Sequence, residues 1–256
     1  MRMRVSDIDS YKYYMEHEEK TYEEFIAELR REATPRPQMF AGTALHEALE
    51  QSAWGDTITH AGGTVCPVVD LGGIDVTLPI PTHGIVEMDA RKTYETSVGT
   101  VDLRGRVDLV AGDHIYDYKL TSSPDVEKYI EAAQWRAYID MLDAYAMTYY
   151  IFGYSKRVDH DSSWGEKYYV TSFAEHTFYR YPTMVDELRQ DIDEFARFYQ
   201  EHVVQPYTQK QGAALKQILY ELESGRVNID DIDRNVLESV HRVLSRVPRG
   251  TLPFAA

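Results

Sequence analysis

The stretch Gly105–Thr121 constrains the fold of this chain more than any other part of the sequence. Two runs of β-branched and aromatic residues flank the short polar segment 111–114, Ala-Gly-Asp-His. This pattern is typical of two antiparallel strands joined by a four-residue loop. Pairing Val110 with Ile115 across the loop sets the register of the predicted hairpin.

This register places two carboxylates opposite each other. Side chains alternate between the faces of a strand, so one face carries the apolar residues Val107, Leu109, Tyr116, Tyr118 and Leu120. The other face carries Asp108, Asp117 and Lys119. Directly opposed residues have Cβ atoms about 5 Å apart, where like charges repel. A divalent metal ion held by both carboxylates would remove this conflict, with Lys119 on the same face.

A simpler interpretation of the hairpin stays open at this point. Charged residues on a half-exposed strand usually face solvent. A register slip of one residue would also move Asp117 to the opposite face. The hairpin alone does not decide between a metal site and a solvated face, and the flanking sequence favours the metal site.

Composition limits the class of protein. The chain has 256 residues, of which 43% are hydrophobic and 27% charged, as expected of a soluble globular protein with a substantial core. The single cysteine, Cys66, excludes an internal disulfide and a site built from four cysteines. The N-terminus lacks the apolar core of a signal peptide, and the apolar run 144–153 is too short to span a bilayer. We therefore expect a cytoplasmic protein, in the host cytoplasm if a phage encodes it, without a membrane partner.

The net charge of −15 argues against a protein that coats nucleic acid along its length. It allows a nuclease whose cleft is locally basic or whose acidic site is neutralised by metal. No zinc finger or helix-turn-helix pattern for reading a base sequence is evident.

The rest of the sequence predicts helices and strands around the hairpin. Helices are expected from Ser6 or Asp7 onward and over 22–32, 42–54, 125–143 and 184–203. Strands are expected over 83–94, 100–102, 146–154 and 167–173, with the last nearer a sheet edge, and 55–82 is expected to be a loop-rich insertion. We expect one domain over residues 1–206 with its core in 40–175, and a small helical appendage and tail over 207–256.

Polar residues recur at helical spacing near the hairpin. His46 and Glu50 are four residues apart, and so are Gln134 and Tyr138, which places each pair on one helix face. A lone helical histidine is usually a satisfied polar residue, and a glutamine beside a packed tyrosine is ordinary. On the strand before the hairpin, either Glu87 or Asp89 is expected to join the site.

Four short motifs occur in order along the chain, namely Gly42-Thr43-x-x-His46, Gly105-Arg106-Val107-Asp108, Asp117-Tyr118-Lys119 and Gln134-x-x-x-Tyr138. The first and last motifs are expected on helices and the middle two on strands. In this order the motifs resemble those of the PD-(D/E)XK nuclease superfamily, and within it those of the RecB-type and phage exonuclease branch. The resemblance covers about residues 40–175, and the segment Ser6–Tyr11 is more weakly similar to the N-terminal segment of the family. It implies a restriction-endonuclease-like α/β fold, with a central mixed sheet flanked by helices.

The resemblance also implies roles for individual residues. Asp108 and Asp117 would bind the catalytic metal, with His46 and the Leu120 carbonyl as further ligands. Lys119 would position or help deprotonate the attacking water and stabilise charge on the phosphate. Gln134 and Tyr138 would support the site and contact the scissile strand.

The implied cofactor is Mg²⁺ or Mn²⁺, because both prefer carboxylate and carbonyl oxygens and an imidazole ligand shifts the preference toward Mn²⁺. The cysteines that hold an iron–sulfur cluster in some relatives are missing, so no such cluster is expected. Val107 replaces the proline that names the family.

We therefore expect a metal-dependent DNA nuclease, an exonuclease acting on DNA ends in phage or bacterial recombination or repair. Linear DNA of either strandedness, a recombination partner protein and other copies of the chain are its expected partners. A structure-specific endonuclease and a non-catalytic DNA-binding scaffold are the alternatives. The complete set of Asp108, Asp117 and Lys119 favours catalysis, because a scaffold has no chemical need for all three.

Overall fold

A computed structural model describes residues 1–17, 19–51, 58–63, 66–71, 84–161 and 163–206 of the chain. The chain divides into two compact units, Met1–Arg197 and Phe198–Ala256, and the account below concerns the first. The predicted C-terminal helices lie outside the described residues. Among the described helices, none combines the length and apolar character needed to cross a membrane.

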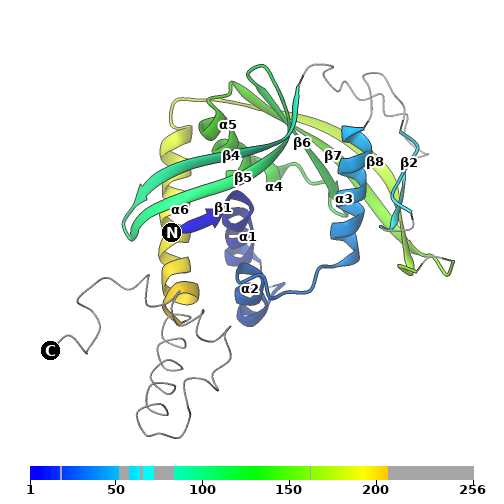
Figure 1. The fold of residues 1–256 in the computed structure, drawn as a ribbon, viewed down its shortest axis with the longest axis horizontal. Helices are drawn as coiled ribbons and strands as arrows, with labels where there is room; N and C mark the ends of the chain where they lie inside the picture. The colour runs from blue at the N-terminus through cyan, green and yellow to red at the C-terminus, as the bar shows by residue number, and fades with distance from the viewer. Residues whose placement is uncertain (18, 52–57, 64–65, 72–83, 162, 207–256) are drawn as a thin grey trace, which may run out of the picture. The chain divides into compact units, whose positions relative to one another are not determined.

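One mixed β-sheet forms the centre of the first unit (Figure 1). Its strands are β1 (Arg2–Arg4), β2 (His60–Ala61), β3 (Val68–Asp70), β4 (Ile85–Thr96), β5 (Gly99–Ala111), β6 (His114–Thr121), β7 (Ala146–Val158) and β8 (Glu166–Tyr179). The order is β1-β5-β6-β7-β8-β3-β2, with β4 also paired to β5. Strands β4, β5 and β6 form an antiparallel meander, whereas β6 and β7 are parallel. A parallel pair needs a crossover, and two short helices between β6 and β7 provide it.

Helices cover both faces of the sheet. They are α1 (Val5–Glu16), α2 (Tyr22–Leu29), α3 (Pro37–Glu50), α4 (Glu127–Ile130), α5 (Ala133–Leu142) and α6 (Met184–Tyr199). The chain then continues into a π-helical turn, η1 (Gln200–Val204), which belongs to the second unit. On one face, Ala41, Leu45 and Leu49 of α3 pack in a core cluster with Tyr118 and Tyr150. Helix α5 packs against β4, β7 and α1. The predicted mixed sheet flanked by helices is confirmed.

The predicted register is confirmed next to the turn, where Leu109 pairs with Tyr116 and Val110 with Ile115. The predicted four-residue loop was wrong, because Ala111 also pairs with His114 and leaves only residues 112–113 in the turn. The expected direct pairing of Asp108 with Asp117 is not part of the ladder, which ends at Leu109 and Tyr116. The turn contains Gly112 in the left-handed region, at φ +64°, a conformation that glycine adopts without steric cost.

Several predicted element boundaries were wrong. The helix expected over 125–143 is broken into α4 and α5, because Ala132 is extended and the chain restarts its helix at Ala133. The helix expected from Gly42 begins at Pro37 instead, since the fixed φ of proline suits the first helical position. Strand β8 was expected near an edge but lies inside the sheet, because β3 from the supposed loop-rich insertion pairs with it.

Candidate active site

The site lies where β5 and β6 separate. Their backbone pairing stops at Leu109 and Tyr116. Beyond that point, the Tyr118 backbone N–H donates to Oδ2 of Asp108 at 2.7 Å. A carboxylate thus replaces the missing strand partner, and Asp108 is held almost fully buried between the two strands.

His46 approaches Asp108 from α3. Its Nε2 lies 2.9 Å from the Tyr118 carbonyl oxygen and its Nδ1 lies 3.3 Å from Oδ1 of Asp108. A carbonyl only accepts hydrogen bonds, so Nε2 carries the hydrogen and Nδ1 faces the carboxylate. Burial lowers the pKa of His46, but the hydrogen bond and charge of Asp108 outweigh burial, and this pKa is raised. A cation, either a proton or a metal ion, is therefore favoured between Nδ1 and Asp108.

Glu87 completes a potential ligand group. One ligand atom from each of His46, Glu87 and Asp108 lies within 4.8 Å of the others. On β4, Val86 pairs with Leu109 and Met88 with Val107, so Glu87 stands opposite Asp108. Its φ of +52° is unusual for a residue with a side chain, and such backbone strain costs about 1–3 kcal/mol.

Asp89, the other carboxylate proposed from this strand, is outside the site. Its side chain is 83% exposed and lies 3.4 Å from the guanidinium of Arg106. Arg106 also contacts Glu87 at 2.9 Å. This arginine balances part of the negative charge at the rim of the site.

Negative charge nevertheless accumulates at the site. Burial, then the charge and hydrogen bond of Glu87, raise the pKa of Glu50, which lies one helical turn after His46. Burial also raises the pKa of Asp117 to about 6, against the lowering effect of Lys119 and with a further increase from Asp108. Crowded carboxylates with raised pKa values suit a divalent cation.

Asp117 and Lys119 form an ion pair next to this group. Lys119 Nζ lies 2.6 Å from Oδ1 of Asp117. The ammonium group is the ionic partner of this buried oxygen, which has no other polar partner among the described residues. Asp117 is not among the three residues grouped by distance. Its role as a ligand, and that of the Leu120 carbonyl, stay predictions.

Helix α5 supports the ion pair and β5. Gln134 donates to Oδ2 of Asp117 at 3.2 Å and accepts a hydrogen bond from the Tyr149 hydroxyl at 3.3 Å. The Tyr138 hydroxyl donates to the Arg106 carbonyl at 2.8 Å. A Cβ on Gly105 would lie 2.4 Å from the Tyr138 ring, which explains the glycine at the start of this motif. Contact of Gln134 or Tyr138 with a nucleic acid strand stays a prediction.

Asp9 is a supporting residue that the sequence analysis missed. Its Oδ1 accepts a hydrogen bond from the backbone N–H of Ala133, the first residue of α5, at 2.6 Å. Burial raises the pKa of Asp9 to about 6, although the Ala133 hydrogen bond and the charge of Lys119 lower it. The two partners are 124 residues apart, so no local spacing could have indicated this contact.

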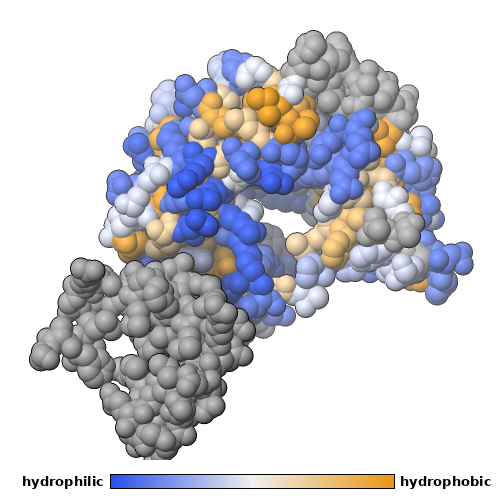
Figure 2. Space-filling model, in the orientation of Figure 1, coloured by the Kyte–Doolittle hydropathy of each residue, from blue (hydrophilic) through white to orange (hydrophobic). Residues whose placement is uncertain are grey.

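The site is accessible from solvent. The side chains of His46 and Lys119 are 29% and 27% exposed. Figure 2 shows an opening below the sheet, in the region between α1 and α3. The partial exposure of His46 and Lys119 means that the candidate site is not sealed within the core.

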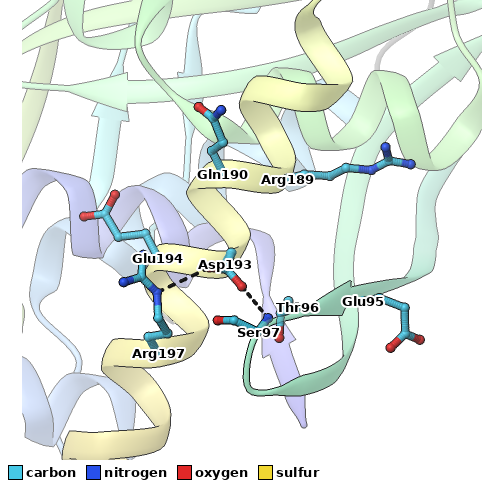
Figure 3. Close-up of a pocket in the computed structure, with 8 residues that line it drawn as sticks. All are labelled: Glu95, Thr96, Ser97, Arg189, Gln190, Asp193, Glu194 and Arg197. Carbon is cyan, nitrogen blue, oxygen red and sulfur yellow. Dashed lines mark hydrogen bonds and ion pairs between the residues drawn. The ribbon is translucent and has the colours of Figure 1, made fainter.

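A separate cavity of about 520 Å³ lies between the β4–β5 turn and α6 (Figure 3). Asp193 accepts the Ser97 N–H at 2.6 Å and pairs with Arg197 at 3.3 Å on its wall. Along β4, Glu95 is eight residues from Glu87, or about 26 Å. This cavity is therefore remote from the ligand group and contains none of the predicted site residues.

Comparisons with known proteins do not identify a family. No protein-family model matches the chain, and no curated protein matches it. A solved structure titled "Crystal structure of SSO0001" aligns over 78% of this chain and 77% of that chain, with 12% sequence identity and a TM-score of 0.46. Similarity at this level carries no argument about function, which must come from the site itself.

Proposed function

We propose that this protein is a divalent-metal-dependent nuclease that hydrolyses phosphodiester bonds in DNA. The observation that carries the proposal is the His46, Glu87 and Asp108 ligand group beside the Asp117–Lys119 ion pair. It combines hard oxygen ligands, one imidazole and a fixed ammonium group within one opening of the sheet. The motif resemblance to RecB-type and phage exonucleases supports the same chemistry.

The ligand group fits Mg²⁺ or Mn²⁺. His46 and Asp108, with Glu87 or Asp117, would hold the ion, and the His46–Tyr118 carbonyl hydrogen bond would orient the imidazole, as is usual for metal-binding histidines. When bound, the ion lowers the pKa of a coordinated water and polarises the phosphate. The crowded carboxylates, among which the pKa of Glu50 is raised, are consistent with such a ligand set.

Lys119 acts as a fixed positive charge in this proposal. Burial lowers its pKa, but the charge and hydrogen bond of Asp117 raise that pKa above the ordinary value. At neutral pH the group is an ammonium, which has no lone pair to accept a proton from water. Lys119 would therefore orient the water and stabilise the negative charge that develops on the phosphate, rather than deprotonate the water.

Action on DNA ends, in phage or bacterial recombination or repair, completes the proposal. It rests on the family resemblance and on the lack of a sequence pattern for reading bases. A chain with a net charge of −15 is also poorly suited to bind long duplex DNA without sequence preference.

The test is incubation of the purified protein with linear DNA in Mn²⁺, Mg²⁺ or EDTA. We expect cleavage in Mn²⁺ and none in EDTA. Lys119→Ala should reduce the rate on the order of 100-fold, the scale of losing a well-placed electrostatic stabiliser. The matched control, Asp89→Asn, removes an exposed carboxylate from β4 and should leave the rate unchanged. Absence of metal-dependent cleavage, or a normal rate in Lys119→Ala, would contradict the proposal.

A further inference from the structure

We propose that one face of the β7–β8 hairpin, carrying Arg157, Lys167 and Tyr169, binds a single strand of DNA and leads it to the site. This surface is called the arm face below. The inference rests on the proposed function and specifies the form of its substrate. It is argued from the strand register, the contacts of Arg157 and the positions of neighbouring cations.

The strand register places these three side chains together. Arg157 pairs with Lys167, and Ser155 pairs with Tyr169. Paired residues project to the same side of a sheet, and Arg157 follows Ser155 by two residues. Arg157, Lys167 and Tyr169 therefore share one face of the hairpin.

The arm face lies on the same side of the sheet as Lys119. Tyr150, Phe152 and Tyr154 belong to or pack against the core cluster under α3, so alternate residues of β7 point toward α3. The intervening residues point to the other side. Among these is Ile151, which pairs with Lys119. From Ile151 to Arg157 is six residues, or about 20 Å along the strand.

The contacts of Arg157 suit a nucleic acid. Its guanidinium carbon lies 4.7 Å from the centre of the Tyr169 ring, and Lys167 Nζ lies 5.0 Å from the same ring. Two cations directly opposed across strands repel each other. Lys167 is balanced by Asp70 at 3.1 Å, whereas Arg157 is exposed and has no ion pair within the described ranges.

An anionic ligand with flat rings would use both parts of this surface. A phosphate would neutralise Arg157, and a base would stack on the ring or on the guanidinium plane. Base faces are free only in an unpaired strand, so the arm face should prefer single-stranded DNA to duplex. Figure 2 shows that the surface at the hairpin end, at the lower right, is mainly hydrophilic.

A further cation lies between the arm face and the site. Lys128 Nζ donates to the Thr121 hydroxyl at 2.9 Å. Thr121 follows Lys119 by two residues on β6 and pairs with Gly153 of β7. Lys119, Lys128 and Arg157 thus follow one another along one side of the sheet, as a path for a phosphate backbone requires.

The test measures binding without cleavage. The full chain is titrated in EDTA against a fluorescent oligothymidylate at a series of salt concentrations. An oligonucleotide of roughly 20 nucleotides is long enough to fill one single-strand-binding site, which typically covers about 4–16 nucleotides. Arg157→Gln should weaken binding several-fold and reduce the slope of log affinity against log salt by about 0.7, the value for one lost phosphate contact. Tyr169→Ala should weaken binding about tenfold with an unchanged slope, and Tyr169→Phe should restore it.

Lys156→Gln is the matched control. Lys156 is adjacent to Arg157 but points to the opposite face and pairs with Glu166 at 3.2 Å, so its loss should change affinity less than twofold. Equal effects of Arg157→Gln and Lys156→Gln, no binding by the wild type, or tighter binding of duplex would each overturn the inference. A wild type that binds the strand but cleaves no DNA in Mn²⁺ would contradict the proposed function alone.

Discussion

Asp108 belongs to both the sheet and the proposed metal site. One carboxylate oxygen accepts the Tyr118 N–H, and the other faces His46. Replacing this side chain by an amide of the same shape should separate the two roles, because the amide oxygen can still accept the backbone hydrogen bond.

We therefore predict that Asp108→Asn lowers Mn²⁺ affinity by at least about tenfold, the scale on which even supporting groups of a metal site act, and abolishes cleavage. In EDTA its thermal midpoint should rise, because one of several crowded negative charges is removed. Titration calorimetry and thermal unfolding measure the two effects, with Asp89→Asn as control. Unchanged Mn²⁺ affinity would show that Asp108 is not a ligand.

Asp117 should make the stability of the metal-free protein depend on pH. Burial raises its pKa from 3.8 to about 6 in the folded state, so the folded protein binds more protons than the unfolded chain between these values. The free energy of unfolding should therefore fall as pH rises from about 4 through 6. In Asp117→Asn, the free energy of unfolding should fall less over this pH range, by on the order of 2 kcal/mol.

The measurement compares urea unfolding of wild type and Asp117→Asn at pH 4.5 and pH 7 in EDTA. Added Mn²⁺ should restore wild-type stability at pH 7, because a cation favours the charged carboxylate. Parallel pH profiles of the two proteins would show that Asp117 titrates normally.

At the scale of elements, Asp9 of α1 caps α5 across the fold. The acceptor for the first N–H of α5 comes from another helix, and Ala132, at the N-cap position, offers no side-chain cap. Gln134, the second residue of α5, then donates to Asp117. The position of α5 therefore links α1 to the ion pair of the site.

We predict that Asp9→Ala destabilises the protein by about 1–2 kcal/mol, as expected for loss of a cap, and reduces the cleavage rate through misplacement of Gln134. Asp9→Asn keeps an acceptor and should retain most of the stability. Urea unfolding and rates at saturating Mn²⁺ test both variants. Equal stability of the Ala and Asn variants would mean that the cap contributes nothing.

The hairpin could be predicted from sequence because a short turn and period-two alternation determine its register locally. The same logic identified Asp108, Asp117 and Lys119 as neighbours. The break at Ala132 could not be predicted, because the acceptor for the first N–H of α5, Asp9, is distant in the chain. Glu87 was a candidate by its strand position, but the sequence did not indicate its left-handed backbone.

At the scale of the whole molecule, net charge limits how the proposed nuclease would bind DNA. Capture along a duplex depends on neutralising many phosphates, and the chain carries a net charge of −15. A strand end that enters a locally basic path needs only a few contacts. We therefore predict that a linearised plasmid is degraded in Mn²⁺ while the same plasmid as a closed circle persists. Gel analysis at equal DNA mass distinguishes the two, and faster loss of the circle would indicate an endonuclease.

The left-handed backbone of Glu87 has a consequence for protein engineering. Glycine adopts this conformation at no steric cost, so Glu87→Gly would relieve strain and remove a carboxylate from a crowded cluster. A screen for heat resistance in the absence of metal would therefore select variants that lack the Glu87 carboxylate. Thermostable variants intended to keep the proposed activity should be selected with Mn²⁺ present, because a bound ion would favour retention of the carboxylate.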